Sequence, residues 1–340
     1  MPALAVADAL RAERAEVVFI GGRRAERQLV PGAGYELRTL RVQPLPRGRP
    51  LHAAGAVVTD AVALRTAWRL LRELRPDAVM GAGGYVAGPV GLAAVLRRLP
   101  LVLIEADSHL GLTNRLLAPF ARRVCLSFPL RGLEGPRYRV TGRPVPAPAS
   151  NRGAARERFG IAGDETCVLV FGGSQGARSI NRAALEAFAG ARFRVLHAAG
   201  ERDLPDLSAP GSHYDLRGYI SDFGEALLAS DLVVARAGGS IFEIAAHGRP
   251  AVLVPYPHAT ADHQAENASF MERAGAAIVI PDEELSAKRL AQEVGALLAD
   301  RARLQAMARA SAALARPEAA SQIAAELLAA ARLCGEEVSA

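Results

Sequence analysis

The chain alternates short apolar β-rich runs with glycine-containing turns and helical segments, and it does so in two series. The first series has β-rich runs at 16–20, 77–80 and 99–104, and the second has them at 166–171, 193–197, 231–235, 251–254 and 276–280. Alternating β and α segments predict parallel sheets joined by right-handed crossovers. The fold class is therefore α/β, and ligands are expected at the carboxyl ends of the strands.

A proline-rich stretch at 143–148 separates the two series and suits an interdomain linker. Because 340 residues exceed the usual size of one hydrophobic core, we expect two Rossmann-like domains whose parallel sheets face each other across a cleft. Their expected bounds are 1–146 and 147–316. A final helix at about 317–333 could pack on either domain.

The charge of the chain is uneven. Residues 1–146 contain 22 Arg and 11 acidic residues, a net charge of +11, and the remainder has a net charge of −5. Such a basic half attracts nucleic acid or anionic lipid, and no nucleic-acid motif favours the first. Three scattered cysteines indicate a reducing, cytoplasmic compartment. The uncharged stretch 78–96 contains five glycines and Pro89, which favours a buried strand, loop and helix over a membrane span.

Phe-Gly-Gly-Ser-Gln-Gly-Ala-Arg at 171–178 lies between an apolar strand and a helix. Glycines let the backbone approach a ligand, and the amides of a helix N-terminus attract a diphosphate. Ser174 and Gln175 are therefore candidate contacts of a phosphate. The alternative is a tight turn without a ligand.

A second turn, Arg236 to Ser240, follows the run at 231–235 and precedes a helix that contains Glu243. A carboxylate there can accept both hydroxyl groups of a ribose, or it can be a helix-capping glutamate. A third segment at 255–267 contains His263 and Gln264, whose side chains can bind sugar hydroxyls. No third ligand follows at a recognisable metal-binding spacing from His258 and His263 in the sequence, so neither a metal nor another cofactor is expected.

In this order and spacing, the three elements resemble the donor-binding domain of the MurG family, two-domain (GT-B) enzymes of glycosyltransferase family 28. Segments 83–89 and 111–115 and the first ten residues resemble the family's second glycine-rich loop, acceptor-side segment and first helix. The resemblance implies transfer of N-acetylglucosamine from UDP to the 4-hydroxyl of the muramoyl sugar of lipid I, giving lipid II of peptidoglycan synthesis. It also implies inversion and a peripheral location on the cytoplasmic face of the membrane.

Carried over by motif, the resemblance assigns donor contacts and acceptor-side residues. Ser174 would lie at the diphosphate, Ile220 would read the uracil edge through its backbone, Glu243 would bind the ribose and Gln264 the sugar. Residues Gly238 to Phe242, between Arg236 and Glu243, are matched to the family's positions only to within one residue. The remaining donor positions are Gly238, Gly239, Ser240, Ile241 and Phe242, and the acceptor-side positions are Gly83, Gly84, Tyr85 and Asn114.

Positions 104–107 read Ile-Glu-Ala-Asp where the family has His-Glu-Gln-Asn. Glu105 is therefore the candidate catalytic base or acceptor ligand, with a structural carboxylate as the alternative. Asp107 takes the place of an asparagine that contacts the donor. Arg143 could replace an arginine that the family has where this chain has Pro146. His109 is either a site residue or a surface histidine.

In the family, a strand and a glycine-rich loop that ends in a histidine precede the first helix. Either this sequence begins after them or the protein is a degenerate relative of the family. We expect the chain as given to bind donor but to turn over lipid I poorly. Two other functions stay open. They are a UDP-sugar epimerase or hydrolase, and a UDP-sugar-binding protein without transferase activity.

A helix is expected around 64–75 as a membrane-surface element. Its apolar stripe would consist of Leu64, Trp68 and Leu71, beside a basic arc of Arg65, Arg69, Arg72 and Arg75. The alternative is an amphipathic helix docked on the sheet with its arginines in solvent.

Overall fold

The computed structural model describes the chain except residues 1, 23–25, 43–49, 174–175, 260–261 and 340, and it describes no side chains for 50–60 and 333–339. The chain forms two compact units. Unit 1 contains Met1–Val145 and Arg316–Ala340, and unit 2 contains Pro146–Ala315.

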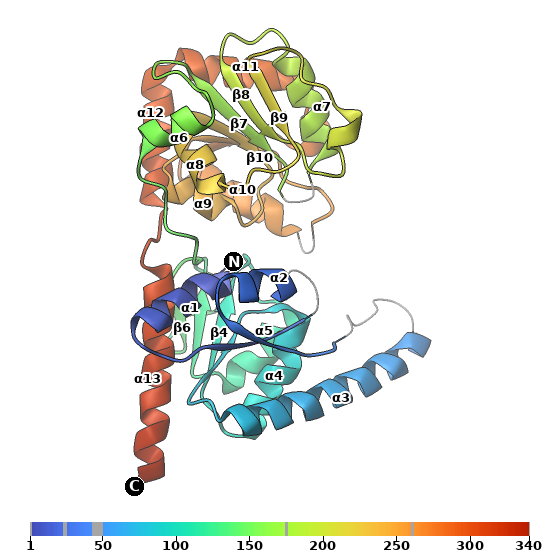
Figure 1. Ribbon diagram of the computed structural model, residues 1–340, viewed down its shortest axis with the longest axis vertical. Helices are drawn as coiled ribbons and strands as arrows, with labels where there is room; N and C mark the ends of the chain where they lie inside the picture. Colours follow the sequence, from blue (N-terminus) through green and yellow to red (C-terminus); the bar gives the residue numbers. More distant parts are fainter. Residues whose placement is uncertain (1, 23–25, 43–49, 174–175, 260–261, 340) are drawn as a thin grey trace. The chain divides into compact units, whose positions relative to one another are not determined.

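Unit 1 holds two parallel sheets among its described residues (Figure 1). A two-stranded sheet pairs β1 with β2, and a four-stranded sheet has the order β3-β4-β5-β6. The strands are β1 (Val18–Gly21), β2 (Glu36–Thr39), β3 (Val79–Gly81), β4 (Leu101–Glu105), β5 (Arg123–Leu126) and β6 (Tyr138–Val140). The helices are α1 (Pro2–Ala12), α2 (Glu26–Gly32), α3 (Pro50–Leu74), α4 (Gly84–Leu96), α5 (Leu112–Leu117), η1 (Ala118–Phe120) and α13 (Ala319–Ser339).

Helices cover both faces of the four-stranded sheet. Leu101, Leu103 and Val124 point to a core shared with α3, α4 and α5. Val102 and Ile104, the alternate residues of β4, point to a second core shared with α1 and α13. This alternation is the period of a strand that is buried on both faces.

Ion pairs of Glu326, which form the Glu326 clasp, attach the last helix, α13, to strands β5 and β6 of unit 1. Glu326 accepts hydrogen bonds from Arg123 Nε of β5 at 2.7 Å and from Arg139 Nη1 of β6 at 2.6 Å. Burial acts to raise the pKa of Glu326, but the hydrogen bonds and charges of the two arginines outweigh it and lower the pKa below its ordinary value. The sequence had left the partner of this helix open.

Unit 2 is built on one six-stranded parallel sheet of order β12-β11-β10-β7-β8-β9. Its strands are β7 (Cys167–Phe171), β8 (Arg194–Ala198), β9 (Tyr214–Arg217), β10 (Leu232–Ala235), β11 (Ala251–Leu253) and β12 (Ala277–Val279). Its helices are α6 (Arg152–Arg158), α7 (Arg178–Ala187), η2 (Leu204–Asp206), α8 (Phe223–Ala229), α9 (Ile241–Ala246), α10 (His263–Arg273), η4 (Asp282–Glu284), α11 (Ala287–Ala299) and α12 (Arg301–Ala313).

Both faces of this sheet are covered as well. Val168 and Val170 of β7 pack into a core with α7 and α11. On the opposite face, the ring of Phe171 packs edge-on against Phe223 of α8 at a centroid distance of 4.9 Å.

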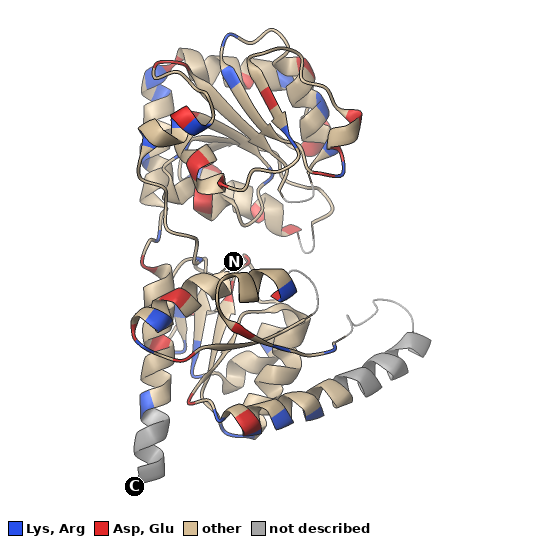
Figure 2. Cartoon of the chain, viewed as in Figure 1, with Lys and Arg blue, Asp and Glu red and all other residues tan. Residues whose placement is uncertain are grey.

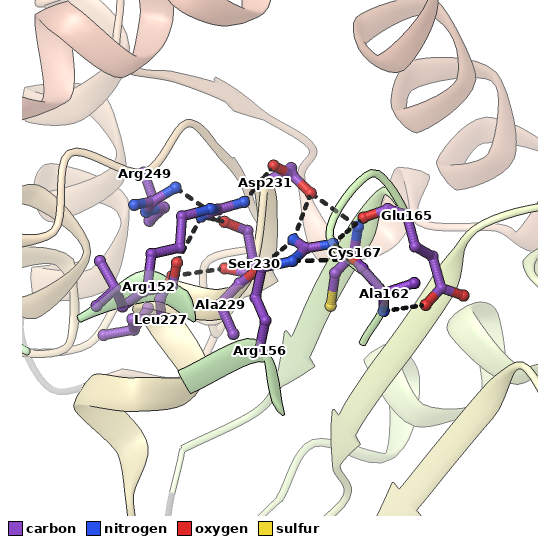
Figure 3. A network of polar contacts seen from close by, with 11 residues as sticks. Arg152, Arg156, Ala162, Glu165, Cys167, Leu227, Ala229, Ser230, Asp231 and Arg249 are labelled. Atoms are coloured by element: carbon purple, nitrogen blue, oxygen red, sulfur yellow. Dashed lines mark hydrogen bonds and ion pairs between the residues drawn. The ribbon is translucent and has the colours of Figure 1, made fainter. Parts of the chain in front are cut away.

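A network of arginines fixes α6 to the amino-terminal ends of β7 and β10 (Figure 3). Arg152 Nη2 bonds Asp231 Oδ1 at 2.6 Å, and Asp231 Oδ2 accepts the backbone N–H of Cys167 at 2.9 Å. Arg249 donates to the carbonyl of Ser230 at 2.9 Å. Burial and the nearby charge of Arg152 lower the pKa of Arg249 to about 10, with Asp231 acting in the opposite direction.

Each of the eight expected β-rich runs overlaps a strand: β1, β3, β4, β7, β8, β10, β11 and β12. The stretch 78–96 forms β3, a turn and α4, which confirms the prediction of a strand, loop and helix. Among the described residues, no helix is long and apolar enough to cross a membrane. The expectation missed β2, β5, β6 and β9.

Candidate functional site

Three loops meet at the carboxyl edge of the sheet of unit 2. Strand β7 pairs with β10, and β10 pairs with β11, so the loops that follow these strands are neighbours. The strand order changes direction between β7 and β10, which makes this edge the topological switch point of the sheet. The three sequence motifs therefore lie together, at the position where such sheets bind ligands.

The loop after β7 has a backbone that only glycine fits. Gly173 has φ +88° and Gly176 has φ +74°, in the left-handed region. A Cβ atom on Gly176 would lie 2.1 Å from the carbonyl oxygen of Ala199. The loop leads into α7, whose N-terminus suits an anion. The predicted phosphate contacts Ser174 and Gln175 lie outside the described residues.

A buried polar network anchors the first turn of α7. Asn181 donates to the carbonyl of Ala199 at 2.9 Å, and its Oδ1 lies 3.1 Å from His197 Nε2. His197 Nδ1 lies 2.8 Å from the hydroxyl of Tyr214. Burial lowers the pKa of His197 to about 4, so the imidazole is neutral at physiological pH.

The turn after β10 leads directly into α9. Gly238, Gly239 and Ser240 are half-buried, and Glu243 lies half-buried in the first turn of the helix, as the motif predicted. The side chains of Ile241 and Phe242 are packed in the core, with exposures of 0% and 8%. These two residues can therefore offer a ligand only their backbone.

Helix α10 supplies two amide side chains to the same turn. Asn267, which is buried, donates to the carbonyl of Ala237 at 2.9 Å. Gln264 accepts the N–H of Tyr256 at 3.0 Å through Oε1, and its Nε2 lies 4.0 Å from a Cβ built on Gly238. The structure thus brings Gln264 to the turn that precedes Glu243. His263, the first residue of α10, is half-buried beside Gln264 in the chain.

Sequence reasoning assigned no role to Arg236, which the structure places at the centre of this edge. Arg236 is 7% exposed, and its guanidinium donates to Asp282 Oδ1 at 2.6 Å, to Ser179 Oγ at 2.8 Å and to the carbonyl of Val254 at 3.1 Å. These bonds join the ends of β10 and β11 to α7. The signal in the sequence was an arginine directly after an apolar strand, where a charge must be paired.

Ile220 follows β9 and is 4% exposed. Its buried side chain leaves the backbone as the part that could read a base. This geometry suits the backbone role that the resemblance implies, which stays a prediction.

In unit 1, Glu105 ends β4 and organises the loop that follows it. Glu105 Oε1 accepts the N–H of Asp107 at 3.1 Å, and Oε2 accepts the N–H of Gly111 and Asn114 Nδ2, both at 2.9 Å. Asn114 Nδ2 also donates to the carbonyl of Ile104 at 2.9 Å. Glu105 and Asn114 are buried, with exposures of 5% and 2%. Both oxygens of this carboxylate are thus engaged inside the protein.

Two further predicted residues adjoin this loop. Arg143 Nη1 donates to the carbonyl of Ala106 at 3.3 Å, next to the half-buried Asp107. His109 is half-buried in the same loop, and its Nδ1 has no hydrogen-bond partner among the described residues. Gly83 and Gly84 form the turn into α4 with positive φ, and Tyr85 is 56% exposed.

The comparisons with known proteins agree with this geometry. Residues 1–126 match the family model of the glycosyltransferase family 28 N-terminal domain, and residues 167–323 match that of the C-terminal domain. A relative from Moorella thermoacetica is 42% identical, over 95% of this chain and 93% of its own length. It is named UDP-N-acetylglucosamine--N-acetylmuramyl-(pentapeptide) pyrophosphoryl-undecaprenol N-acetylglucosamine transferase. The chain belongs to the MurG family of glycosyltransferase family 28.

Solved structures extend the comparison. The crystal structure of MurG from Acinetobacter baumannii has a TM-score of 0.75 and 28% identity, covering 96% of this chain and 95% of that one. A putative UDP-N-acetylglucosamine 2-epimerase from Listeria monocytogenes has a TM-score of 0.71 at 16% identity, covering 96% and 91%. The second likeness shows the fold alone. The predicted GT-B class is confirmed for this MurG-family chain.

One prediction for this MurG-family chain needs correction. Leu71 of α3 is 2% exposed and packs in the core of unit 1, and Leu64 packs against the same core. They cannot form a stripe that faces a membrane, because α3 packs this side against α4 and the core of unit 1. Trp68 is 39% exposed, with the guanidinium of Arg97 5.0 Å from its ring centroid.

The basic arc of α3 does face solvent. Arg65, Arg69, Arg72 and Arg75 are exposed, and Arg69 pairs only loosely with Glu73 at 3.6 Å. In Figure 2 the described part of α3 carries more basic than acidic residues.

Proposed function

We propose that the protein transfers N-acetylglucosamine from UDP-N-acetylglucosamine to the muramoyl 4-hydroxyl of lipid I, forming lipid II. The observation that carries this proposal is the meeting of three motifs at one sheet edge, in a chain of the MurG family. These motifs are the glycine loop before α7, Glu243 on α9 and Gln264 on α10. The relative from Moorella thermoacetica is named for the same reaction.

The donor roles follow from the chemistry of these groups. The amides at the start of α7 and the loop with Ser174 and Gln175 would hold the diphosphate, and the helix dipole would stabilise the departing UDP. Glu243 would accept the ribose hydroxyls, and Gln264 and His263 would bind the sugar. The backbone from Gly238 to Phe242 would line the nucleotide, and Ile220 would meet the base through its backbone.

On the acceptor side, we assign Glu105 a positioning role. Its two oxygens accept three hydrogen bonds from its own loop, so it fixes the segment that carries Asp107 and leads to Asn114. Gly83, Gly84 and Tyr85 would contact the acceptor, and Asp107 and Arg143 the donor.

The lipid-linked acceptor implies contact with an anionic membrane surface on the cytoplasmic side. Ten of the twelve large apolar side chains exposed in the described structure belong to unit 1, including Trp68, Leu92 and Leu116. Unit 1 thus exposes apolar side chains as well as the arginines of α3, a combination that suits an anionic bilayer. Flotation with anionic vesicles should be strong at low salt and weaken as salt is added, and equal flotation with neutral vesicles would refute it.

The donor site is tested by Glu243→Ala, with Glu272→Ala on the exposed face of α10 as the matched control. Loss of a charge-assisted hydrogen bond costs about 1.5–3 kcal/mol, so Glu243→Ala should weaken UDP binding at least about tenfold in calorimetry. The control should bind UDP as the parent does. Unchanged affinity of Glu243→Ala would mean that the motif has been misread.

The reaction itself is tested with UDP-N-acetylglucosamine and a lipid I analogue. The expected product is the disaccharide lipid, formed only when both substrates are present. Formation of an epimer or of free N-acetylglucosamine from the donor alone would favour an epimerase or a hydrolase. Donor binding without any product would favour a sugar-nucleotide-binding protein.

A further inference from the structure

The proline-rich linker is stiff up to the residue where it docks on unit 2. Residues 143–148 read Arg-Pro-Val-Pro-Ala-Pro, so every position is a proline or precedes one. Proline fixes its own φ and restricts the residue before it to extended conformations. Residues 146–148 are exposed, whereas Ala149 is half-buried. A contact at Ala149 therefore sets the direction in which a semi-rigid segment leaves unit 2.

The side chain of His247, directly after α9, makes this contact. The backbone N–H of Ala149 donates to His247 Nε2 at 3.2 Å, and His247 Nδ1 lies 2.8 Å from the carbonyl oxygen of Glu243. A carbonyl oxygen only accepts and a backbone N–H only donates, so Nδ1 carries the proton and Nε2 offers the lone pair. One neutral tautomer of His247 thus satisfies both hydrogen bonds.

The surroundings of His247 favour this neutral ring. Burial lowers the pKa of His247 below its ordinary value, the hydrogen bond with the backbone of Glu243 acts to raise it, and the charge of Arg249 lowers it further. On the side of α8, a Cβ atom built on Gly224 would lie 3.5 Å from His247 Nε2. The imidazole is therefore held between α8, the linker and α9 in the form that its two hydrogen bonds require.

The same end of α9 contacts the segment that leads to the second connection between the units. Gly248 has φ +58°, and a Cβ atom built on it would lie 3.2 Å from the Cβ atom of Ala312 in α12. Unit 2 spans Pro146–Ala315, so Ala149 and Ala312 each lie three residues from one of its ends. The carboxyl end of α9 thus holds both segments through which the chain enters and leaves unit 2.

Helix α9 also carries Glu243, in its first turn. A helix of six residues has little stability of its own, so its position depends on what holds its two ends. Asn267 holds the amino-terminal side, through its bond to the carbonyl of Ala237 at 2.9 Å, and His247 holds the carboxyl-terminal side. A ligand that binds Glu243 and restrains α9 therefore also restrains the hydrogen bonds of His247.

We propose that His247 is a positioning residue that couples occupation of the donor site at Glu243 to the hold on the linker at Ala149. The inference rests on the proposed function, because it takes Glu243 as the ribose ligand. UDP restrains α9 and so stabilises the bond between Ala149 and His247. By reciprocity, the anchored linker raises the affinity for UDP by the same factor.

Hydrogen exchange of the Ala149 amide, measured with and without saturating UDP, tests this coupling. In the parent, UDP should slow this exchange about fivefold or more, the low end of typical coupling between sites. The amide of the exposed Ala147 is the internal reference and should not respond. In His247→Ala, the Ala149 amide should exchange about three- to tenfold faster than in the parent, because it loses one hydrogen bond, and UDP should no longer slow it.

Two further substitutions separate the two hydrogen bonds of the ring. Glutamine places a side-chain oxygen near the position of Nε2, whereas asparagine reaches only as far as the position of Nδ1. His247→Gln should therefore restore most of the protection of Ala149 and its response to UDP, and His247→Asn should behave like His247→Ala. The control is His213→Ala, which removes another half-buried histidine that bonds a backbone carbonyl, at 2.9 Å, and it should match the parent.

Three results would overturn the inference. They are exchange of the Ala149 amide that UDP leaves unchanged in the parent, equal exchange in the parent and in His247→Ala, and equal behaviour of the glutamine and asparagine variants. Calorimetry with UDP separates these failures from failure of the proposed function. A parent that binds no UDP removes the donor site and the coupling together, whereas a parent that binds UDP without protecting Ala149 removes only the coupling.

Discussion

The glycine loop after β7 offers a matched pair of substitutions. Gly173 and Gly176 both have positive φ, so alanine at either position carries backbone strain of about 1–2 kcal/mol. They differ in their surroundings. A Cβ on Gly173 meets no atom within 4 Å, whereas a Cβ on Gly176 would lie 2.1 Å from the carbonyl oxygen of Ala199.

The carbonyl of Ala199 cannot move without cost, because it accepts the 2.9 Å hydrogen bond from Asn181 in the first turn of α7. Displacing it would remove that bond, a further cost of about 0.5–1.5 kcal/mol, in addition to the close contact itself. Gly176→Ala should therefore destabilise unit 2 by about 2–4 kcal/mol, against about 1–2 kcal/mol for Gly173→Ala.

Scanning calorimetry and UDP titration measure both effects. Gly176→Ala should lower the unfolding temperature more than Gly173→Ala and should weaken UDP binding more, because it shifts the N-terminus of α7. Gly190→Ala, at an uncrowded position without positive φ, is the control and should leave both quantities near those of the parent. Equal destabilisation by the two loop variants would refute the reasoning from Ala199.

Three further predictions concern single titratable groups. Glu105→Gln should speed hydrogen exchange of the Asp107 amide at least about tenfold, because the substitution replaces one acceptor oxygen of the side chain by a donor. The control Glu13→Gln, at an exposed position, should leave the exchange rate of this amide unchanged. Exchange of the Asp107 amide that is as slow in Glu105→Gln as in the control would contradict the positioning role. Because the folded-state pKa of Glu326 is lowered, its stabilisation is present above the unfolded-state pKa and is lost as pH falls through the lowered value. Acid unfolding should show that Glu326→Gln lacks this pH dependence, and identical profiles would count against the clasp. Burial lowers the pKa of His197 in the folded state from 6.5 to about 4, so its protonation should lower the free energy of unfolding by roughly 3 kcal/mol as pH falls from about 6.5 to 4. In urea titrations, His197→Phe should reduce this dependence of the free energy of unfolding on pH.

Much of the fold could be predicted because the central strands have a strong local signal. The runs that became β7, β10 and β11 are continuously apolar, which is the pattern of a parallel strand covered on both faces. Strands β2, β6 and β9 were missed because they lie at sheet edges and mix charged with apolar residues, as in Tyr-Asp-Leu-Arg of β9. Strand β5 has four residues and begins with Arg123, which leaves too short an apolar run to detect.

The candidate site was predictable where its chemistry is local. A glycine loop, a first-turn carboxylate and an amide at a helix start are all visible in the order of residues, and pairing of β7, β10 and β11 brings them together. The role of Arg236 was not predictable, because its partners Ser179, Val254 and Asp282 come from three other segments.

Helix α3 shows the limit of periodicity. A stripe of Leu64, Trp68 and Leu71 beside an arginine arc describes a membrane-surface helix and a helix docked on a sheet equally well. Only the neighbours of the helix distinguish them, and Leu71 is in the core.

The sequence by itself determined the alternation of strands and helices, the break near the proline-rich linker and the placing of each motif directly after a strand. These depend on backbone preferences and side-chain periods that act over a few residues. Only the tertiary structure decided that α13 clasps unit 1 through Glu326, that both oxygens of Glu105 are engaged and that the N–H of Ala149 donates to His247. Each of these three features joins residues from separate elements. A local sequence pattern determines which face of an element is apolar, but it does not determine which other element covers that face. Long-range packing makes that choice.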